Sequence, residues 1–292
     1  MAATYGELLK KGAEMLRQAG TADARYDAEW LLLAVTEKTR SFLFLHGEEE
    51  CGNEAAEQYF QLIARRSDGE PVQYITGSQE FMGLSFEVNP SVLIPRQDTE
   101  TLAEQALAEA AEMPRPLRVL DLCCGSGAIA VSVAHALPEA EVTAADVSEA
   151  SLDTARRNAE NNHVADRISF LRTDMFSAFR EKAERGERAA FDLILCNPPY
   201  IPTEVIPTLQ KEITEHEPVG ALDGGADGLD FYRILAEDAW HFLEPDGKLI
   251  VEIGSDQAES VSALFRAEGH YMEPAVVRDL AGKDRVIRCR KR

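Results

Sequence analysis

The chain has 292 residues, of which 45% are hydrophobic and 28% charged, and its formal net charge is −21. This length exceeds one small core and suits a catalytic domain of about 200 residues with a smaller partner domain. The charge argues against direct binding of nucleic acid, because that affinity comes from Lys and Arg displacing phosphate counterions.

Local patterns disfavour several other classes of protein. No apolar run approaches the roughly 18 to 20 residues that cross a bilayer, and residues 1–10 show no secretion signal. The five cysteines form no CxxC pair, and the six histidines lack metal-ligand spacing. We therefore expect a cytoplasmic protein with reduced thiols, no membrane segment and no metal.

The first 72 residues predict a small helical bundle. Apolar residues recur at helical spacing in residues 5–16 and again in 30–33, and two shorter helices are expected at 41–45 and 54–66. Threonines before the first two helices, Thr4 and Thr21, are suitable N-caps. Residues 73–96 then change to β-type residues broken by glycine and proline, which predicts a β-hairpin linker.

From residue 97 to 292 helical and strand-like segments alternate. Strands are expected at residues 117–122, 141–145, 167–171, 191–196, 248–253 and in the last twenty residues. Helices are expected at residues 99–112, 128–137, 149–162, 229–242 and 257–268. This alternation predicts an α/β fold whose mostly parallel sheet binds ligands at the carboxyl ends of its strands.

The most informative turn is VLDLCCGSGAIA at residues 119–130, an apolar strand followed by small residues and a helix. Glycines here tolerate positive φ and let the backbone pass close to a ligand. A dinucleotide site would show GxGxxG with its pyrophosphate at the helix N-terminus. Only GxG follows Asp121, so a nucleoside without phosphates is the better fit.

Two acids stand at the ends of the next two strands. Asp146 can accept hydrogen bonds from both ribose hydroxyls of an adenosine. Asp174 can take the exocyclic amino group of the adenine, and Met175 or Phe176 can pack on its ring. Each acid alone could be a helix cap, but the glycine turn and both acids arrive in order at three strand ends.

The fourth strand leads into Asn197-Pro198-Pro199-Tyr200. Two prolines remove two N–H donors, which leaves the carbonyl groups of this turn free of local partners. An incoming NH2 group can donate one hydrogen to the Asn197 side-chain oxygen and one to a carbonyl such as that of Pro198. This grip aims the nitrogen at a methyl donor, while Tyr200 packs on the planar acceptor. The alternative is a merely rigid turn.

Three further features stay open at this point. In the segment LIPRQDTE, at residues 93–100, Asp98 or Thr99 can cap a helix and Arg96 can pair with a neighbouring acid. The glycine-rich segment at residues 221–229 is either a lid over the site or an ordinary loop. Cys123 and Cys124 are expected to pack rather than act as nucleophiles, because no histidine is placed to activate them.

Together these segments resemble the peptide chain release factor N5-glutamine methyltransferases. The resemblance spans nearly the whole chain and rests on the helical N-terminal domain and four motifs. The motifs are LIPRQDTE at residues 93–100, DLCCGSGAIA at 121–130, NPPYI at 197–201, and EP with ALDGGADGL at 217–229. NPPY is shared with adenine-N6 methyltransferases, whereas the first and last segments are more specific.

The resemblance implies a Rossmann-like class I methyltransferase sheet, mostly parallel and of seven strands, with a small N-terminal helical bundle and a β-hairpin linker. The expected domains are a docking domain (1–72), the linker (73–96) and the catalytic domain (97–292). The expected cofactor is S-adenosyl-L-methionine, which leaves as S-adenosyl-L-homocysteine, with no metal. The acceptor is the glutamine side-chain amide in the Gly-Gly-Gln loop of class 1 release factors, and a monomer is expected.

The resemblance also distributes the site residues. Those lining the methionine part of the cofactor are Asp121, Cys123, Cys124, Gly125, Ser126 and Gly127; Asp146 holds the ribose, and Asp174 and Met175 bracket the adenine. Asn197 and Pro198 grip the substrate amide, Pro199 and Tyr200 shape its slot, and Asn197 also borders the cofactor. Arg96 is a candidate for contact with the substrate. Met175 stands where relatives commonly have an aromatic residue, and the cofactor turn has fewer Gly and Thr than many relatives.

Three alternatives remain. A sister family methylates a glutamine of a ribosomal protein, and LIPRQDTE favours release factors over it. An adenine-N6 nucleic-acid methyltransferase would use NPPY equally well, but the net charge of −21 opposes it. A non-catalytic S-adenosylmethionine sensor would have no need of the Asn197 turn.

Overall fold

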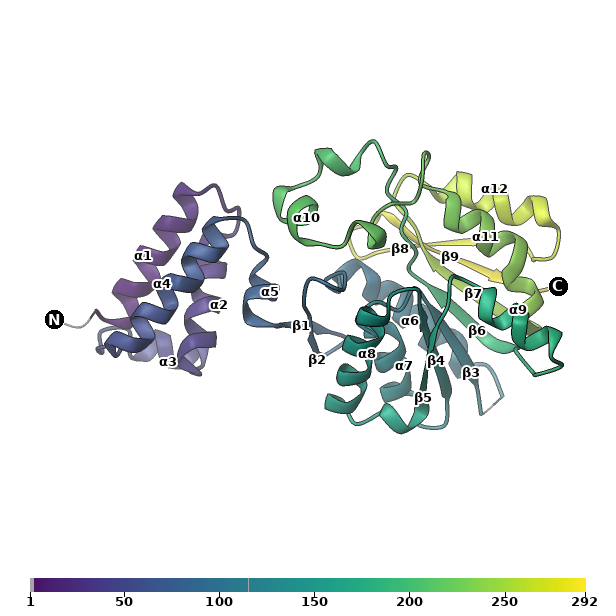
Figure 1. Cartoon of the computed structure of the whole chain (residues 1–292), viewed down its shortest axis with the longest axis horizontal. Coiled ribbons are helices and arrows are strands. Elements are labelled where there is room, and N and C mark those ends of the chain that lie inside the picture. The colour runs from purple at the N-terminus through teal and green to yellow at the C-terminus, as the bar shows by residue number, and fades with distance from the viewer. Residues whose placement is uncertain (1–2, 115) are drawn as a thin grey trace. The chain divides into compact units, whose positions relative to one another are not determined.

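The computed structural model describes residues 3–114 and 116–292 (Figure 1). The chain separates into two compact units. Unit 1 contains the chain up to Ser78 together with Gln210–His216, and unit 2 contains Gln79–Leu209 and Glu217–Arg292. None of the described helices is both long and apolar enough to span a membrane.

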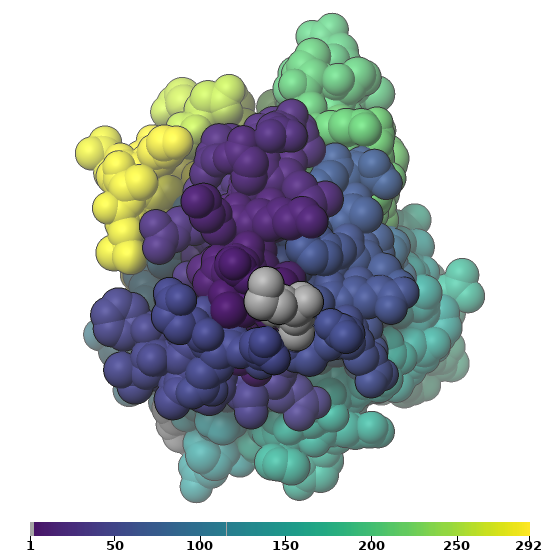
Figure 2. Space-filling model, turned by 90° about the vertical axis from the view of Figure 1, so that its left-hand side faces the viewer, coloured from purple at the N-terminus to yellow at the C-terminus, as the bar shows by residue number. Residues whose placement is uncertain are grey.

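Unit 1 is the expected helical bundle. Its helices are α1 (Tyr5–Gln18), α2 (Ala24–Thr36), α3 (Arg40–Leu45), α4 (Asn53–Ser67) and α5 (Val72–Thr76). The first helix has a capping box, in which the Thr4 side chain accepts from the Glu7 N–H and the Glu7 carboxylate accepts from the Thr4 N–H. The prediction for Thr21 was wrong, since Asp23 is the N-cap residue of α2. Figure 2 shows the surface of this unit in purple to blue.

A short helix from the middle of the sequence also belongs to unit 1. Helix α10 (Lys211–His216) carries Glu212, whose carboxylate lies 2.8 Å from Arg66. Arg66 also donates to the buried Asp27 at 2.6 Å. A buried carboxylate is stabilised by such a partner, so the contact ties α10 to α2 and α4. Nothing in the periodicity of the sequence predicted this grouping.

The expected hairpin is shorter than predicted. Strands β1 (Ser78–Phe81) and β2 (Leu84–Glu87) pair across a turn at Met82 and Gly83, both with positive φ. The prediction was wrong for residues 73–76, which belong to the short helix α5 with Val72 and Tyr74 buried. Residues 88–96 contain no strand and lead into the catalytic unit.

Unit 2 is built on the expected seven-stranded sheet, in the order β5-β4-β3-β6-β7-β9-β8. Its strands are β3 (Arg118–Leu122), β4 (Glu141–Asp146), β5 (Ile168–Arg172), β6 (Phe191–Cys196), β7 (Leu243–Glu252), β8 (Ala275–Arg278) and β9 (Asp284–Arg290). Strands β3 to β7 pair in parallel, whereas β9 is antiparallel to both β7 and β8. Strand β7 begins before residue 248, where it was predicted to begin. The reason is an irregularity in its pairing with β6, which leaves residues 244–247 without register partners.

Helices cover both faces of the sheet, as the alternation of elements predicts. One core contains apolar residues of α6 (Gln97–Ala111), α7 (Ala128–Ala136) and α8 (Glu149–Asn161). The other contains those of α9 (Ser177–Glu184), α11 (Asp230–Asp238) and α12 (Ala258–Glu268). Along β6, Leu193 and Leu195 enter the first core, and Ile194 and Cys196 enter the second.

Candidate active site

The site lies at the carboxyl ends of β3, β4 and β6, where the strand order reverses. Such a switch point is where open α/β sheets bind ligands. Pocket residues from the expected site are Arg96, Cys123, Cys124, Gly125, Ser126, Asp146, Asp174, Met175, Asn197 and Pro199. The described lining does not include Asp121, Gly127, Pro198 or Tyr200.

The glycine turn has the backbone that its sequence requires. Gly125 has a φ of +54° and would direct a Cβ into open space, so its missing side chain leaves room beside the pocket. A Cβ on Gly127 would lie 2.9 Å from that of Ala155, so this glycine permits the close approach of α8. Cys123 also has a positive φ, of 57°, and such strain is typical of functional turns.

Asp121 lies beneath this turn rather than in the pocket. Its side chain is buried, and its Oδ2 accepts from the Ala130 N–H at 2.9 Å. Burial raises the pKa of this carboxyl group to about 8. The contact joins the end of β3 to the first turn of α7, which makes Asp121 a support for the turn above it.

Asp146 holds two turns together at the pocket wall. Its Oδ2 accepts from the Gly125 N–H and its Oδ1 accepts from the Ser148 N–H, both at 2.9 Å. Burial raises its pKa, and these backbone hydrogen bonds oppose the rise. Each carboxylate oxygen has a second lone pair, so both can still accept from a vicinal diol.

The end of β5 supplies the opposite side of the pocket. Asp174 and Met175 line it, and Met175 has a φ of 44°. Phe176 does not line it: the ring is fully buried and stacks on Phe242 with centroids 5.1 Å apart. Of the two residues proposed to pack on an adenine, only Met175 therefore borders the pocket.

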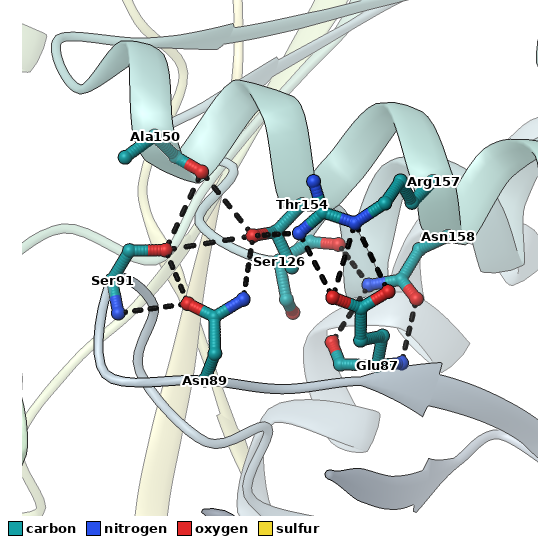
Figure 3. Close-up of polar contacts among 8 residues, drawn as sticks. All are labelled: Glu87, Asn89, Ser91, Ser126, Ala150, Thr154, Arg157 and Asn158. Atoms are coloured by element: carbon teal, nitrogen blue, oxygen red, sulfur yellow. Dashed lines mark hydrogen bonds and ion pairs between the residues drawn. The ribbon is translucent and has the colours of Figure 1, made fainter.

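A buried asparagine on α8 connects the hairpin to the glycine turn (Figure 3). The Asn158 amide donates to the Glu87 carbonyl at 3.0 Å and to the Ser126 carbonyl at 2.9 Å. Its oxygen accepts from the Glu87 N–H at 2.6 Å. Arg157 pairs with the Glu87 carboxylate, and Asn89 donates to Thr154 at 3.0 Å. These contacts hold residues 87–91 against α8, beside the pocket.

The NPPY turn follows β6 and orients Asn197 through α6. The Asn197 Nδ2 donates to the Thr99 Oγ1 at 3.3 Å, so the side-chain oxygen remains for another donor. Thr99 is buried, and both residues line the pocket. The expectation that Asp98 or Thr99 caps the helix was wrong. The helix starts at Gln97 without a side-chain cap, because these two side chains face tertiary partners instead.

Tyr200 points away from the pocket and toward a buried acid. Its hydroxyl donates to Oε1 of Glu252 at 3.3 Å, at the end of β7. The Glu252 side chain is buried, which raises its pKa to about 7, and hydrogen bonding by Thr99 and Tyr200 limits the rise. Burial likewise raises the pKa of Tyr200.

The glycine-rich segment at residues 221–229 is fastened to the NPPY turn. The Ile201 N–H donates to the Leu222 carbonyl, and the Gly224 N–H donates to the Ile201 carbonyl, both at 2.9 Å. A Cβ on Gly224 would lie 2.7 Å from the Tyr200 Cα. Gln257 donates to the carbonyls of Tyr200 and Gly228. Residues 221–229 therefore form a clamp on the NPPY turn and not a free lid.

Arg96, which lines the pocket, pairs with Glu217. The Glu217 side chain is buried, and it also accepts from the Ile94 N–H at 3.3 Å. The Arg96 side chain is 40% exposed, so part of it still faces solvent. Arg96 thus pairs with an acid, as the sequence allowed. That acid is 121 residues away in the sequence and not a close neighbour.

The comparisons with known proteins cover both units. Residues 7–77 match the family described as PrmC N-terminal domain, and residues 98–216 match the methyltransferase small domain. The release factor glutamine methyltransferase of Moorella thermoacetica is 42% identical over 99% of each chain. The enzyme of that name from Geobacter sulfurreducens is 42% identical over 97% of this chain and 93% of its own.

The chain belongs to the release factor glutamine methyltransferase family. Among solved structures, a SAM-dependent methyltransferase from Agrobacterium tumefaciens matches with a TM-score of 0.51 and 18% identity. That likeness covers 73% of this chain and 69% of the other, and it bears on the fold alone. The expected class I methyltransferase fold is confirmed.

Several residues of this family member's site had not been assigned from sequence. Glu252 is the last residue of the apolar strand β7, Gln257 follows that strand, and Thr99 lies in the first turn of α6. The missed signal was an acid at the end of a buried strand. Because Cys196 pairs with Val251 in parallel, the next residues, Asn197 and Glu252, emerge side by side.

The described pocket suits a cationic adenosine derivative without phosphates. Its carboxylates are Asp146 and Asp174, and its one cationic side chain among the described lining residues, Arg96, is already paired. Phosphates require unpaired cations or free helix N–H groups, whereas a sulfonium and a ribose favour acids and open backbone. The space that a Cβ on Gly125 would fill supports this reading. No group of acids, His or Cys in the described chain could hold a metal.

Proposed function

We propose that this chain transfers a methyl group from S-adenosyl-L-methionine to the side-chain amide nitrogen of the glutamine in the Gly-Gly-Gln loop of class 1 release factors. The observation that carries the proposal is the orientation of Asn197. Its Nδ2 is engaged by Thr99, which leaves its oxygen available at the pocket for an N–H donor. Membership of the family supplies the identity of the acceptor.

Asn197 and Pro198 perform the positioning. A primary amide has two N–H donors, and the Asn197 Oδ1 and the Pro198 carbonyl accept one each. Holding both hydrogens in the plane of the amide leaves the axis above the nitrogen for the methyl group. Such alignment supplies much of the rate of a bimolecular transfer.

The bound cofactor supplies an electrophilic methyl group on a positively charged sulfur. The amide nitrogen forms the new C–N bond, the C–S bond breaks with its electron pair going to sulfur, and one proton leaves the nitrogen. The products are N5-methylglutamine, S-adenosyl-L-homocysteine and H⁺. Asn197 and Pro198 receive the partial positive charge that develops on the two N–H groups.

Asp146, Asp174, Met175 and the turn from Cys123 to Gly127 would hold the cofactor. The two lone-pair positions left on Asp146 suit the ribose hydroxyls. Asp174 and Met175 would border the adenine, and Gly125 gives the methionine part close access to the backbone. Asp121 would act indirectly, because it supports the turn from below.

We assign recognition of the whole release factor to unit 1, with this chain acting as a monomer. Large apolar side chains are exposed there: Phe44 is 88% and Leu45 73% exposed at the end of α3. Tyr26, on α2, is 50% exposed. Clusters of exposed apolar residues commonly mark surfaces that bind another protein.

The test is mass spectrometry of an unmodified class 1 release factor after incubation with this protein and S-adenosyl-L-methionine. We expect a gain of one methyl group on the Gly-Gly-Gln glutamine. Asn197→Ala should lower kcat by about 100-fold or more, because a positioning contact to the reacting nitrogen is lost. Methylation of ribosomal protein or of nucleic acid, with none on the release factor, would overturn the substrate assignment.

A further inference from the structure

A chain of side-chain contacts runs from the NPPY turn into the core. Asn197 Nδ2 carries only hydrogens, so at 3.3 Å the Thr99 Oγ1 must be the acceptor. The single hydroxyl hydrogen of Thr99 is then left for another acceptor. The Glu252 carboxylate is the acceptor at hand: Asn197 and Glu252 each follow one of the paired residues Cys196 and Val251 on β6 and β7. Hydrogen bonding by Thr99 also favours the charged form of Glu252.

The same carboxylate holds the other end of the turn. The Tyr200 hydroxyl donates to Glu252 Oε1 at 3.3 Å, and the Tyr232 hydroxyl donates to the Glu252 backbone carbonyl at 2.8 Å. Glu252 is 2% exposed, and its Oε2 has no hydrogen-bond partner among the described residues. A buried carboxylate with an unsatisfied oxygen costs stability, so folding alone does not account for an acid at this position.

Charged and titratable groups surround Glu252 on several elements. Arg285 of β9 favours the ionised carboxylate, whereas Asp98 of α6 opposes it. Arg285 itself lies 2.9 Å from Asp98 and 3.2 Å from Asp279, so its charge is shared. Tyr200 and Tyr232 complete the surroundings as neutral hydroxyl donors, because burial raises the pKa of both.

We propose that Glu252 is the positioning residue of this methyl transfer: as a buried acceptor it orients Thr99 and Tyr200, and through Thr99 it sets the amide orientation of Asn197. The inference rests on the proposed function for its effect on rate, but the orientation of Asn197 can be measured separately. Glu252 does not line the pocket, so it acts through other residues and not on substrate.

The negative charge of the ionised Glu252 sets the direction in which these side-chain hydrogen bonds run. A carboxylate draws both hydroxyl hydrogens toward itself, which leaves the Thr99 oxygen as an acceptor for Asn197. Once protonated, Glu252 no longer imposes that direction, and Asn197 can rotate its amide. Burial raises the pKa of Glu252 to about 7, so the orientation changes in the neutral range.

The first experiment compares wild type with Glu252→Gln, which keeps the shape and removes the charge. For wild type we expect kcat to rise with pH through about 7. For Glu252→Gln we expect kcat to be at least about 10-fold lower and its rise near pH 7 to be absent. The affinity for S-adenosyl-L-homocysteine, measured by calorimetry, should change by less than about twofold.

Thr99 offers a matched pair in case Glu252→Gln folds poorly. Thr99→Val keeps the shape without the hydroxyl and should lower kcat on the order of 10-fold. Thr99→Ser keeps the hydroxyl and should recover most of that loss. A kcat of Thr99→Val equal to that of wild type, or a Thr99→Ser variant that recovers none of the loss, would overturn the role of the Thr99 hydroxyl.

The second experiment follows Asn197 itself, without any protein substrate. In 15N-labelled protein with S-adenosyl-L-homocysteine bound, its side-chain NH2 signals are assigned by their loss in Asn197→Ala. These signals should shift with pH around 7 in wild type and not in Glu252→Gln. Invariant signals in wild type, or the same titration in both proteins, would refute the inference. Absence of release factor methylation by wild type would instead refute the proposed function.

Discussion

At the scale of single residues, Asp146 is a carboxylate that supports the fold beside the pocket and that we propose also binds the cofactor. It ties the glycine turn to the turn after β4 by two backbone hydrogen bonds of 2.9 Å. The same two oxygens face the pocket that suits a ribose. A charge-assisted hydrogen bond is stronger than a neutral one, so the charge of Asp146 should matter more than its shape.

We predict that Asp146→Asn weakens binding of S-adenosyl-L-homocysteine by about 10- to 100-fold, because one acceptor oxygen and the negative charge are lost. Isothermal titration calorimetry measures this directly. The control is Asp153→Asn on the nearby helix α8, where the carboxylate is exposed and pairs with Arg156. Unchanged affinity in Asp146→Asn would exclude a role in holding the ribose.

Glu252 predicts a second effect that concerns stability rather than rate. Its ordinary pKa of 4.5 is raised to about 7 in the fold. The folded protein therefore holds this proton over a pH range in which the unfolded chain has released it. The associated stability is fully present below pH 4.5 and is lost as the pH rises through about 7.

Glu252→Gln removes this dependence. Relative to wild type, its free energy of unfolding should improve by about 2 to 3 kcal/mol between pH 5 and pH 8, following the size of the shift. Urea denaturation at several pH values measures the difference. If the two proteins lose stability in parallel across this range, Glu252 does not titrate there. The proposed pH dependence of the Asn197 orientation is then wrong.

At the scale of elements, the site depends on two loops that fit backbone to backbone. A Cβ on Gly228 would lie 2.4 Å from the Tyr200 carbonyl oxygen and 2.9 Å from Gln257, and its φ is +73°. Only glycine satisfies both conditions at this position. The clamp formed by residues 221–229 therefore sets the position of the NPPY turn through its main chain.

We predict that Gly228→Ala costs about 2 to 4 kcal/mol of stability and lowers kcat at least about 10-fold, since the added methyl group displaces Tyr200. Gly269→Ala is the matched control. That glycine has a φ of +71° at the end of α12 but open space around a Cβ, so it should cost only about 1 kcal/mol without affecting kcat. Thermal melts and steady-state kinetics separate the two effects. If both variants lose the same stability and the same kcat, residues 221–229 do not position the NPPY turn.

At the scale of the whole molecule, the described chain consists of two compact units. Unit 2 contains the pocket and the NPPY turn, whereas unit 1 is a helical bundle with its own core and exposed apolar side chains. If unit 1 recognises the release factor, as we propose, substitutions there should change recognition without changing the chemistry in unit 2. The helix α10 adds to unit 1 from within the catalytic sequence, through Arg66 and Glu212.

We predict that Phe44→Asp raises KM for an intact release factor about tenfold, because a charge replaces an exposed apolar contact. Its kcat and its affinity for S-adenosyl-L-homocysteine should remain as in wild type. Leu280→Asp is the matched control, since Leu280 is 96% exposed but belongs to unit 2. An unchanged KM in Phe44→Asp would place the docking surface elsewhere.

The sequence by itself determined the elements and the main parts of the site. Helical and strand periodicity located the sheet strands to within a few residues, apart from the early start of β7 at a bulge. The motifs after β3, β4, β5 and β6 were expected to meet because parallel strands end at one edge of a sheet. Nine of the expected site residues between Cys123 and Pro199, together with Arg96, do line one pocket.

Only the tertiary structure decided which side chains support that pocket. Thr99, Asn197 and Glu252 come from three elements and meet only through strand register and the packing of α6. Arg96 meets Glu217, and Asn158 meets Glu87, over 121 and 71 residues of sequence. Periodicity reports which face of an element is buried but not which partner it meets. Such long-range contacts are set by the packing of the whole fold.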